Sequence, residues 1–346
     1  MTALSDNLQP LSMSQLLDRA IRLYRNNFLI FVGIVALAQI PATAVNMLGL
    51  WLAPAPDVTF NPSASLTDFW LEIAQSSGFG NNPWLWLGQL VSLLLVQLAT
   101  AALTKAVAEN YLGHKIGLFE AYQRIGRHGL ALLVAAFLSI LVILGLLVWW
   151  VIVPCVGWIS GLGMLFFFSL VILPLIAPVI VLEHRSASQA IQRAWDLARR
   201  RIWWLIGFML LLGLFGQLVV TGPGVLSIFI LQSILGSGVD TTTITLLQQV
   251  ILLLLNLIYL PLQLTCVTLL YFDIRVRTEG FDLAVLALSD GVDSETVRVT
   301  APPLEKNTLP RWEEIGYFSL ITVAIAVLYI ALLLIFVVAA LGFSGF

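Results

Sequence analysis

The sequence predicts an all-α integral membrane protein: a six-span helical bundle of three repeated hairpins with cytoplasmic amphipathic helices, plus a C-terminal seventh span. Composition is the first reason, because 60% of the 346 residues are hydrophobic and 10% are charged, against about 25% charged residues in soluble domains. Seven long apolar runs are the second, and a basic motif that recurs before alternate runs is the third. The net charge of −2 also argues against a nucleic-acid binder.

Each candidate span is an apolar run of the length that a bilayer requires, which is about 20 residues in helical form. A further run over 225–235 is too short to span and is bracketed by glycine-rich turn signals, so we predict an interfacial or re-entrant helix there. Cys155 falls in a short turn and Cys266 in an apolar run, and we expect no disulfide between them. The predicted spans are 28–52, 84–104, 130–152, 158–182, 202–220, 243–272 and 316–342.

The basic residues predict the orientation of the chain. All 17 Lys and Arg residues fall before the first span or after an even-numbered span, which places them on one side of the membrane. Because basic loops remain in the cytoplasm, we predict a cytoplasmic N-terminus and an external C-terminus. The first 27 residues lack the apolar segment of a cleavable signal peptide, so the first span is expected to direct insertion. The expected location is a bacterial inner (plasma) membrane or an internal photosynthetic membrane.

A nine-residue motif occurs twice, from Ser12 to Ala20 and from Ser186 to Ala194. Each copy opens with Ser-x-x-Gln, a capping box that starts a helix, and a weaker third copy ends at Arg124. The first copy has apolar residues at helical spacing and arginines on the other face, which predicts an amphipathic helix in the membrane interface. We therefore expect a basic surface helix and a two-span hairpin, repeated three times.

The predicted organisation follows from these features. It comprises an amphipathic helix in 1–27, a six-span membrane domain in 28–282, a cytoplasmic linker in 283–315 and a transmembrane helix in 316–346.

Polar side chains within the spans leave two interpretations open. No ionisable residue lies in the middle of a predicted span, which argues against ion or proton transport through the spans. The amides either form interhelical hydrogen bonds, worth under about 1 kcal/mol each, or line a polar cavity for a neutral headgroup or solute. Such a cavity would involve Gln89, Gln97, Asn256 and Gln263. The full set is Gln39, Asn46, Gln89, Gln97, Gln248, Gln249, Asn256 and Gln263.

Charged clusters at the cytoplasmic ends of the spans are the candidate lipid or partner contacts. Basic residues at the inner leaflet gain about 1 kcal/mol each from anionic lipid. Two interpretations of the cluster that follows the sixth span remain open. Its residues either form a charged helix end and pair with one another, or form a cytoplasmic docking patch for a partner. The candidates are Arg22, Arg25, Arg199, Arg200, Arg201, Asp273, Arg275, Arg277 and Glu279.

The sequence contains no recognisable catalytic constellation. His114, His128 and His184 lie in separate segments without metal-ligand spacing. Neither a phosphate-binding Gly-Lys-Ser/Thr loop nor a Gly-x-Ser-x-Gly nucleophile elbow is present. We expect no enzymatic activity, no cofactor and no metal.

Three stretches resemble the membrane domain found at the N-terminus of some glycerophosphoryl diester phosphodiesterases, which also occurs as a stand-alone bacterial membrane protein. They are 11–28, 181–195 and 269–282, and the last contains Tyr-Phe-Asp-Ile-Arg-Val-Arg-Thr-Glu-Gly-Phe-Asp. The resemblance covers about 8–284 and implies a six-span bundle. The fused enzymes carry a soluble catalytic barrel where this chain has a linker and a seventh span, so their activity is not expected here.

These observations favour a non-enzymatic polytopic membrane protein that acts as a scaffold, an assembly factor or an accessory subunit of a membrane complex. A lipid- or small-solute-handling protein of transporter-like construction is the alternative. The expected partners are the lipid bilayer, anionic phospholipids and other membrane-protein subunits or further copies of the chain. No nucleic-acid partner is expected.

Overall fold

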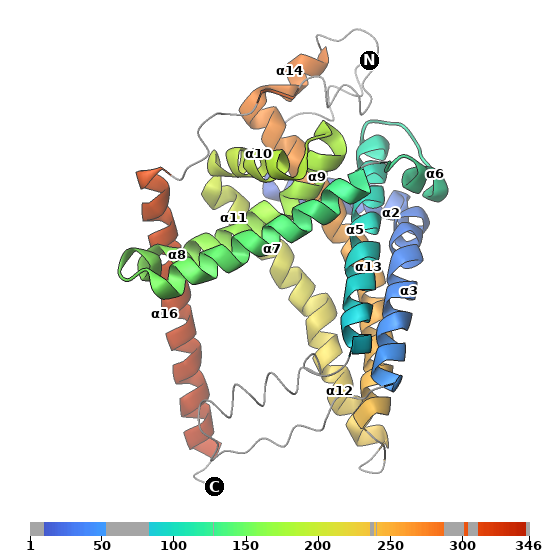
Figure 1. The fold of residues 1–346 in the computed structure, drawn as a ribbon, viewed down its shortest axis with the longest axis vertical. Helices are drawn as coiled ribbons and strands as arrows, with labels where there is room; N and C mark the ends of the chain where they lie inside the picture. The colour runs from blue at the N-terminus through green and yellow to red at the C-terminus, as the bar shows by residue number, and fades with distance from the viewer. Residues whose placement is uncertain are drawn as a thin grey trace.

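Every element in the described part of the computed structural model is a helix (Figure 1). Within that part, seven helices are long and apolar enough to cross a membrane, and they correspond to the seven predicted spans. The chain is therefore an all-α polytopic membrane protein. The described residues are 10–52, 83–126, 128–235, 239, 241–286, 301–303 and 311–343.

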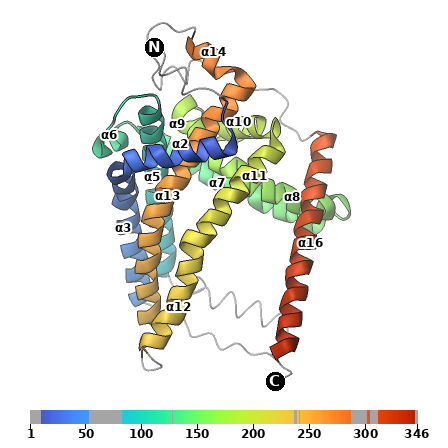
Figure 2. The same ribbon diagram turned by 180° about the vertical axis from the view of Figure 1, so that it is seen from behind.

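The first hairpin joins α3 (Phe28–Leu52) and α5 (Pro83–Tyr111), which pack along each other. Before it, α2 (Met13–Asn26) lies across α13 at one end of the bundle (Figure 2). Leu16 and Ala20 of α2 are buried at a spacing of four residues, while Arg22 is exposed. The predicted amphipathic surface helix is confirmed.

The second hairpin contains a turn of π-helix within its return segment. Pro174 lacks an N–H group, and the wider π turn immediately before it accommodates the missing hydrogen bond. Close packing of the two arms depends on Gly161, where a Cβ atom would lie 2.8 Å from the Cβ of Trp150. Figure 1 shows α7 and α8 inclined across the bundle. The hairpin comprises α7 (His128–Ile152), α8 (Val156–Phe167), η2 (Phe168–Ile172) and α9 (Leu173–Glu183).

The third hairpin corrects one prediction, because the segment 225–235 is neither a separate interfacial helix nor re-entrant. It continues the preceding span through a π turn, so that Gly222-Pro223-Gly224 lies inside a helix. The π register accommodates the missing N–H of Pro223, and Gly224 allows contact with α13, since a Cβ there would lie 2.6 Å from Leu252 Cδ2. The elements are α11 (Ile202–Gly216), η3 (Gln217–Thr221), α12 (Gly222–Leu235) and α13 (Thr241–Glu279).

The predicted repeat is visible in the helix caps. Ser12 and Ser186 are the N-caps of α2 and α10 (Ala187–Arg199), and both capping boxes are formed, with Gln15 and Gln189 at the third helical position. The third copy forms the short helix α6 (Leu118–Gln123), where the Gly117 N–H donates to Glu120 Oε2 over 3.4 Å. We refer to the end of the bundle that holds α2, α6 and α10 as the charged end.

The last helix, α16 (Trp312–Phe343), packs chiefly against α8. At Gly163 of α8 a Cβ atom would lie 2.0 Å from the carbonyl oxygen of Phe318, and the Gly163 N–H donates to Thr322 Oγ1 over 2.8 Å. Further along α16, Val327 and Leu328 are exposed. The described contacts with α8 include Phe318 and Thr322, in the first half of α16. The short helix α14 (Phe281–Leu286) follows α13 at the charged end.

Candidate functional site

Five polar side chains from three helices form a buried cluster at the charged end. Arg193 Nε donates to both oxygens of Glu183 over 3.1 Å, and its terminal nitrogen lies 2.6 Å from Glu279 Oε1. Arg275 Nε donates to Glu279 Oε2 over 3.0 Å. The Tyr271 hydroxyl donates to Glu183 Oε1 over 2.8 Å and accepts from Arg275. Because four of these groups are buried and the side chain of Glu279 is only 7% exposed, removing one charge leaves its partner without compensation in a low dielectric.

The same face of α13 holds the start of the described chain. The backbone N–H of Leu11 donates to Asp273 Oδ1 over 2.7 Å, and Arg277 donates to the carbonyl oxygen of Leu11. Arg277 also pairs with Asp273 over 2.7 Å and lies over the ring of Trp204. These contacts join the entry to α2 firmly to the end of α13.

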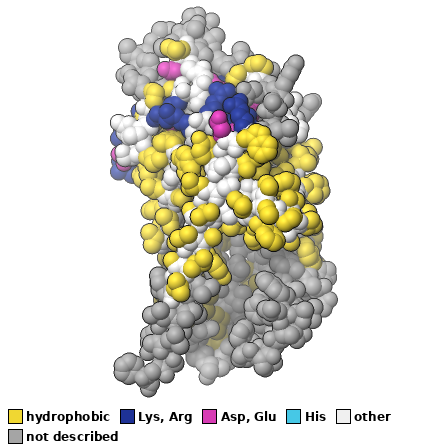
Figure 3. All heavy atoms as spheres, turned by 90° about the vertical axis from the view of Figure 1, so that its left-hand side faces the viewer, with side chains coloured by type: hydrophobic (Ala, Val, Ile, Leu, Met, Phe, Trp, Pro, Cys, Tyr) yellow, Lys and Arg dark blue, Asp and Glu magenta, His cyan; other side chains and the backbone are white. Residues whose placement is uncertain are grey.

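Two further ion pairs connect neighbouring helices at the charged end. Glu109 of α5 is buried and lies 3.3 Å from Lys105 Nζ and 3.8 Å from the guanidinium of Arg124. Arg199 of α10 lies 3.1 Å from Glu314 of α16. On the face drawn in Figure 3, the basic and acidic side chains gather toward one end, and the surface below them is apolar.

The candidate contacts divide into two groups by exposure. Asp273 and Arg275 are buried, the side chain of Glu279 is 7% exposed, and all three form ion pairs within the chain. Arg199 and Arg277 are also paired within the chain. These internal pairs argue against a docking patch at the end of α13, because each of its carboxylates is already paired with a cation of this chain. The candidates whose side chains remain exposed are Arg22, Arg25, Arg200 and Arg201.

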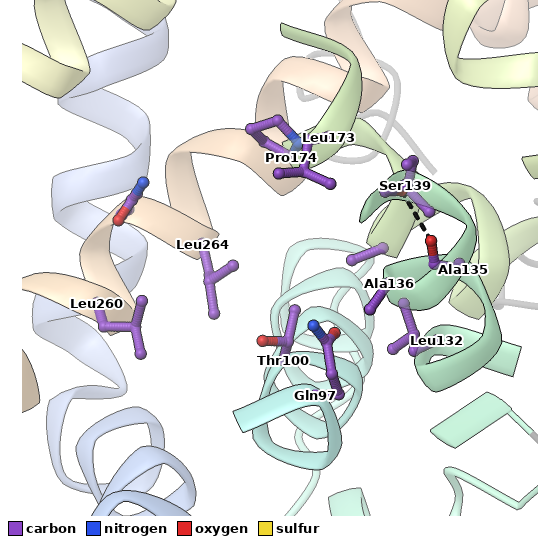
Figure 4. A pocket seen from close by; sticks show the side chains of 13 residues that line it. Gln97, Thr100, Leu132, Ala135, Ala136, Ser139, Leu173, Pro174, Leu260 and Leu264 are labelled. Carbon is purple, nitrogen blue, oxygen red and sulfur yellow. Dashed lines mark hydrogen bonds between the residues drawn. The ribbon is translucent and has the colours of Figure 1, made fainter. Parts of the chain in front are cut away.

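A cavity of about 250 Å³ lies within the bundle, between α5, α7, α9 and α13 (Figure 4). Two of the four predicted amides line it: Gln97 from α5 and Gln263 from α13. The other two do not, because Gln89 is exposed on the outer face of α5 and Asn256 donates to the Leu252 carbonyl of its own helix. The expected cavity is therefore present but smaller and more apolar than a continuous polar channel.

Small residues and a proline give this cavity its space. Ala135 and Ala136 of α7 and Ala177 of α9 present only methyl groups to it. Ser139 lines it too, but its hydroxyl donates back to the Ala135 carbonyl over 2.7 Å. Pro174 lies on the wall directly after the π turn, and π turns are frequent at functional sites. The side-chain amides are thus the polar groups best placed to bind a guest.

Other amides in the spans serve as interhelical contacts. Asn46 of α3 donates to Ser92 Oγ of α5 over 2.7 Å, which is the structural interpretation given to these residues from the sequence. The interhelical interpretation therefore applies to Asn46, whereas Gln97 and Gln263 line the cavity.

Sequence reasoning missed the partners of the motif after α13. Glu183, Arg193 and Tyr271 complete the buried cluster, although none was a candidate contact. The repeat held the available signal, because Arg19 and Arg193 occupy equivalent positions in the two copies, and Arg19 donates to Tyr111 on another helix.

Two of the three histidines, His128 and His184, lie next to each other although they are far apart in the sequence. The rings of His128 and His184 lie 4.4 Å apart between centroids, at the start of α7 and the end of α9. In the described ranges, no group of three or more His, Cys, Asp and Glu side chains is placed to hold a metal ion. The free thiols of Cys155 and Cys266 form no disulfide, as expected.

Comparisons with known proteins add no relative. No protein-family model matches the chain, and neither a curated protein nor a solved structure matches it significantly.

Proposed function

We propose that this protein binds a lipid, or a small neutral solute of similar polarity, within the membrane. The cavity lined by Gln97 and Gln263 carries the proposal. Gln97 lies roughly 20 Å along α5 from Tyr111, at the rise of a straight helix, so a guest there would sit deep in the hydrocarbon. A neutral amide suits a carbonyl or hydroxyl group, and the apolar remainder of the wall suits hydrocarbon.

The size of the cavity favours part of a molecule over a whole one. Its volume of about 250 Å³ is below the roughly 300–1,000 Å³ of pockets that enclose drug-sized ligands. Gln97, Gln263 and Leu260 are only partly buried, so the cavity is not sealed from the surface. A chain that enters from the surrounding lipid fits these features.

The orientation and the lipid contacts belong to the same proposal. We place the charged end in the cytoplasm, where exposed Arg22, Arg25, Arg200 and Arg201 would each gain about 1 kcal/mol from anionic headgroups. The membrane is proposed to be a bacterial inner membrane or an internal photosynthetic one. Residues 8–284 resemble only the membrane domain of the phosphodiesterases, and a linker and a seventh span follow in place of the catalytic barrel. This resemblance supports a non-catalytic role.

The test is the amount of lipid retained by the full chain after purification in mild detergent, measured by native mass spectrometry. The variant Gln97→Leu with Gln263→Leu should retain roughly tenfold less than the natural chain, since each lost hydrogen bond contributes about 0.5–1.5 kcal/mol. Gln89→Leu is the matched control, because it removes an exposed amide from the same helix and should retain lipid normally. Equal retention by both variants would contradict the proposal.

A second function is favoured by α16. The apolar side chains Val327, Leu328 and Ile330 are exposed, and α16 packs chiefly against α8. Such a helix suits an accessory or scaffold subunit that packs against another membrane protein. Affinity purification in mild detergent tests this role, since repeated recovery of the chain alone would exclude a stable partner.

A further inference from the structure

The turn that joins α7 to α8 lies nearer to the charged end than the far ends of the other spans do. In Figures 1 and 2 it lies beside the first half of α16, while α3, α12 and the rest of α16 continue well beyond it. The contacts agree with this level, because the Gly163 N–H of α8 donates to Thr322, which lies about 15 Å along α16 from Trp312. Val156 of α8 and Val327 of α16 are both exposed, so α8 crosses α16 instead of running along it.

Packing on two sides holds the α7–α8 hairpin in this inclined position. On one side, Gly163 leaves no space for a Cβ atom against the Phe318 carbonyl, and the rings of Phe167 and Phe318 lie 5.5 Å apart between centroids. On the other side, α10 packs on α7. Within the hairpin, Gly157 leaves no space for a Cβ atom against the Trp149 carbonyl, so the two arms stay together up to the turn.

The chemistry of the turn suits the surface of a membrane and not its hydrocarbon core. The first N–H groups of a helix have no partner within the helix, and the N-cap of α8, Cys155, makes no side-chain capping hydrogen bond to them. Irregular backbone exposed to lipid is not tolerated in hydrocarbon. Trp149 and Trp158 flank the turn and are 42% and 59% exposed, and tryptophans of this kind lie at the headgroup level.

The first hairpin marks the same membrane surface at another level. Trp51 is exposed at the end of α3, about 35 Å along the helix from Phe28, which matches a hydrocarbon core of about 30 Å. Trp149 lies about 32 Å along α7 from His128, but α7 is inclined, so this length does not bring it to the level of Trp51 (Figure 1). Both ends satisfy their headgroup preference only if the surface between them is not flat.

We propose that the leaflet opposite the charged end is drawn inward at the α7–α8 turn, so that the bilayer is thinner beside α8 and α16 than around α3. A bilayer adapts to a short span by thinning, at a modest cost for each ångström of mismatch. Hydration of the polar backbone at the turn offsets that cost. The partner in this inference is the lipid surface itself, and a headgroup would have a shorter path through the core beside this hairpin. The inference does not depend on a guest between Gln97 and Gln263.

The experiment uses Cys155, which is exposed at the turn, whereas Cys266 is buried and does not compete for a label. The full chain carries a nitroxide at Cys155 in vesicles of dioleoylphosphatidylcholine and dioleoylphosphatidylglycerol. Collision with a polar nickel chelate and with oxygen then reports the depth of the label. Two reference labels in a Cys155→Ser background are Trp51→Cys at the far end of α3 and Ile40→Cys, exposed about 18 Å along α3 from Phe28.

We expect the Cys155 label to collide with the nickel chelate as often as the Trp51→Cys label, and severalfold more often than the Ile40→Cys label. A Cys155 label as inaccessible to the chelate as Ile40→Cys would overturn the proposal, because the turn would then lie in hydrocarbon without thinning.

A distance measurement excludes an upright hairpin, which would also expose the turn to water. Second labels are placed at Val323→Cys or Leu334→Cys, two exposed positions about 17 Å apart along α16, and pulsed electron spin resonance measures their distances to the Cys155 label. We expect the Cys155 label to lie closer to position 323 than to position 334. The reverse order would overturn the proposal even if the turn is accessible to the chelate.

Discussion

Replacing Arg193 by glutamine tests whether the buried cluster holds α9, α10 and α13 together. Arg193 is 3% exposed and pairs with two carboxylates, those of Glu183 and Glu279. Breaking a buried pair costs about 3–5 kcal/mol. Arg275 remains 3.0 Å from Glu279, and Arg185 remains 3.5 Å from Glu183, so the expected loss is at the lower end, about 3 kcal/mol. That corresponds to more than about a hundredfold in the unfolding equilibrium.

The assay is reversible unfolding of the full chain in mixed micelles, followed by circular dichroism. Arg22→Gln is the control, because Arg22 is exposed on an equivalent surface helix, and it should lie within about 0.5 kcal/mol of the natural chain. Adding Glu183→Gln to Arg193→Gln removes the uncompensated charge and should restore part of the loss, with a coupling energy of about 1–3 kcal/mol. A loss below about 1 kcal/mol for Arg193→Gln, or strict additivity in the double variant, would refute the reasoning.

Three other predictions follow from the packing, the charge pattern and the hydrogen bonds. Gly163→Ala should separate α16 from α8 and destabilise the chain by about 1–3 kcal/mol in the same unfolding assay, because the new Cβ would meet a backbone carbonyl. Gly213→Ala, in a helix with open space around the glycine, should be neutral or stabilising. Burial raises the pKa of Tyr122 to about 12, so the stability it contributes is present below about pH 10 and is lost as the pH rises through about 12. Tyr122→Phe should abolish that alkaline loss and lower stability at neutral pH by about 1 kcal/mol, since the hydroxyl donates to the Ile34 carbonyl. Reporter fusions should place the N-terminus in the cytoplasm and the C-terminus outside, and two termini on one side would contradict the proposed orientation.

Local patterns predicted most of the fold. The apolar runs predicted the seven helices of spanning length, and the Ser-x-x-Gln pattern predicted the capping boxes at the starts of α2 and α10. The segment 225–235 was misinterpreted because Gly222-Pro223-Gly224 is a turn signal in water. Within a helical bundle, the π turn before it absorbs the missing hydrogen bond, and the glycine packs against α13.

The candidate site was less predictable, because its contacts join residues far apart in the sequence. Charge pattern alone could not show whether Arg275 and Glu279 face solvent or Arg193, which is 86 residues from Glu279. Likewise, the set of amides in the spans contained Gln97 and Gln263, but only the crossing of α5, α7, α9 and α13 separates them from Gln89 and Asn256.

A density map of the natively purified chain in lipid nanodiscs tests the central claim most directly. The claim is that the bundle holds a lipid or a similar neutral guest between Gln97 and Gln263. The account predicts elongated density in this cavity, within hydrogen-bond distance of at least one of the two amides. A cavity closed by the two amides hydrogen-bonded to neighbouring helices, with no room for a guest, would contradict it.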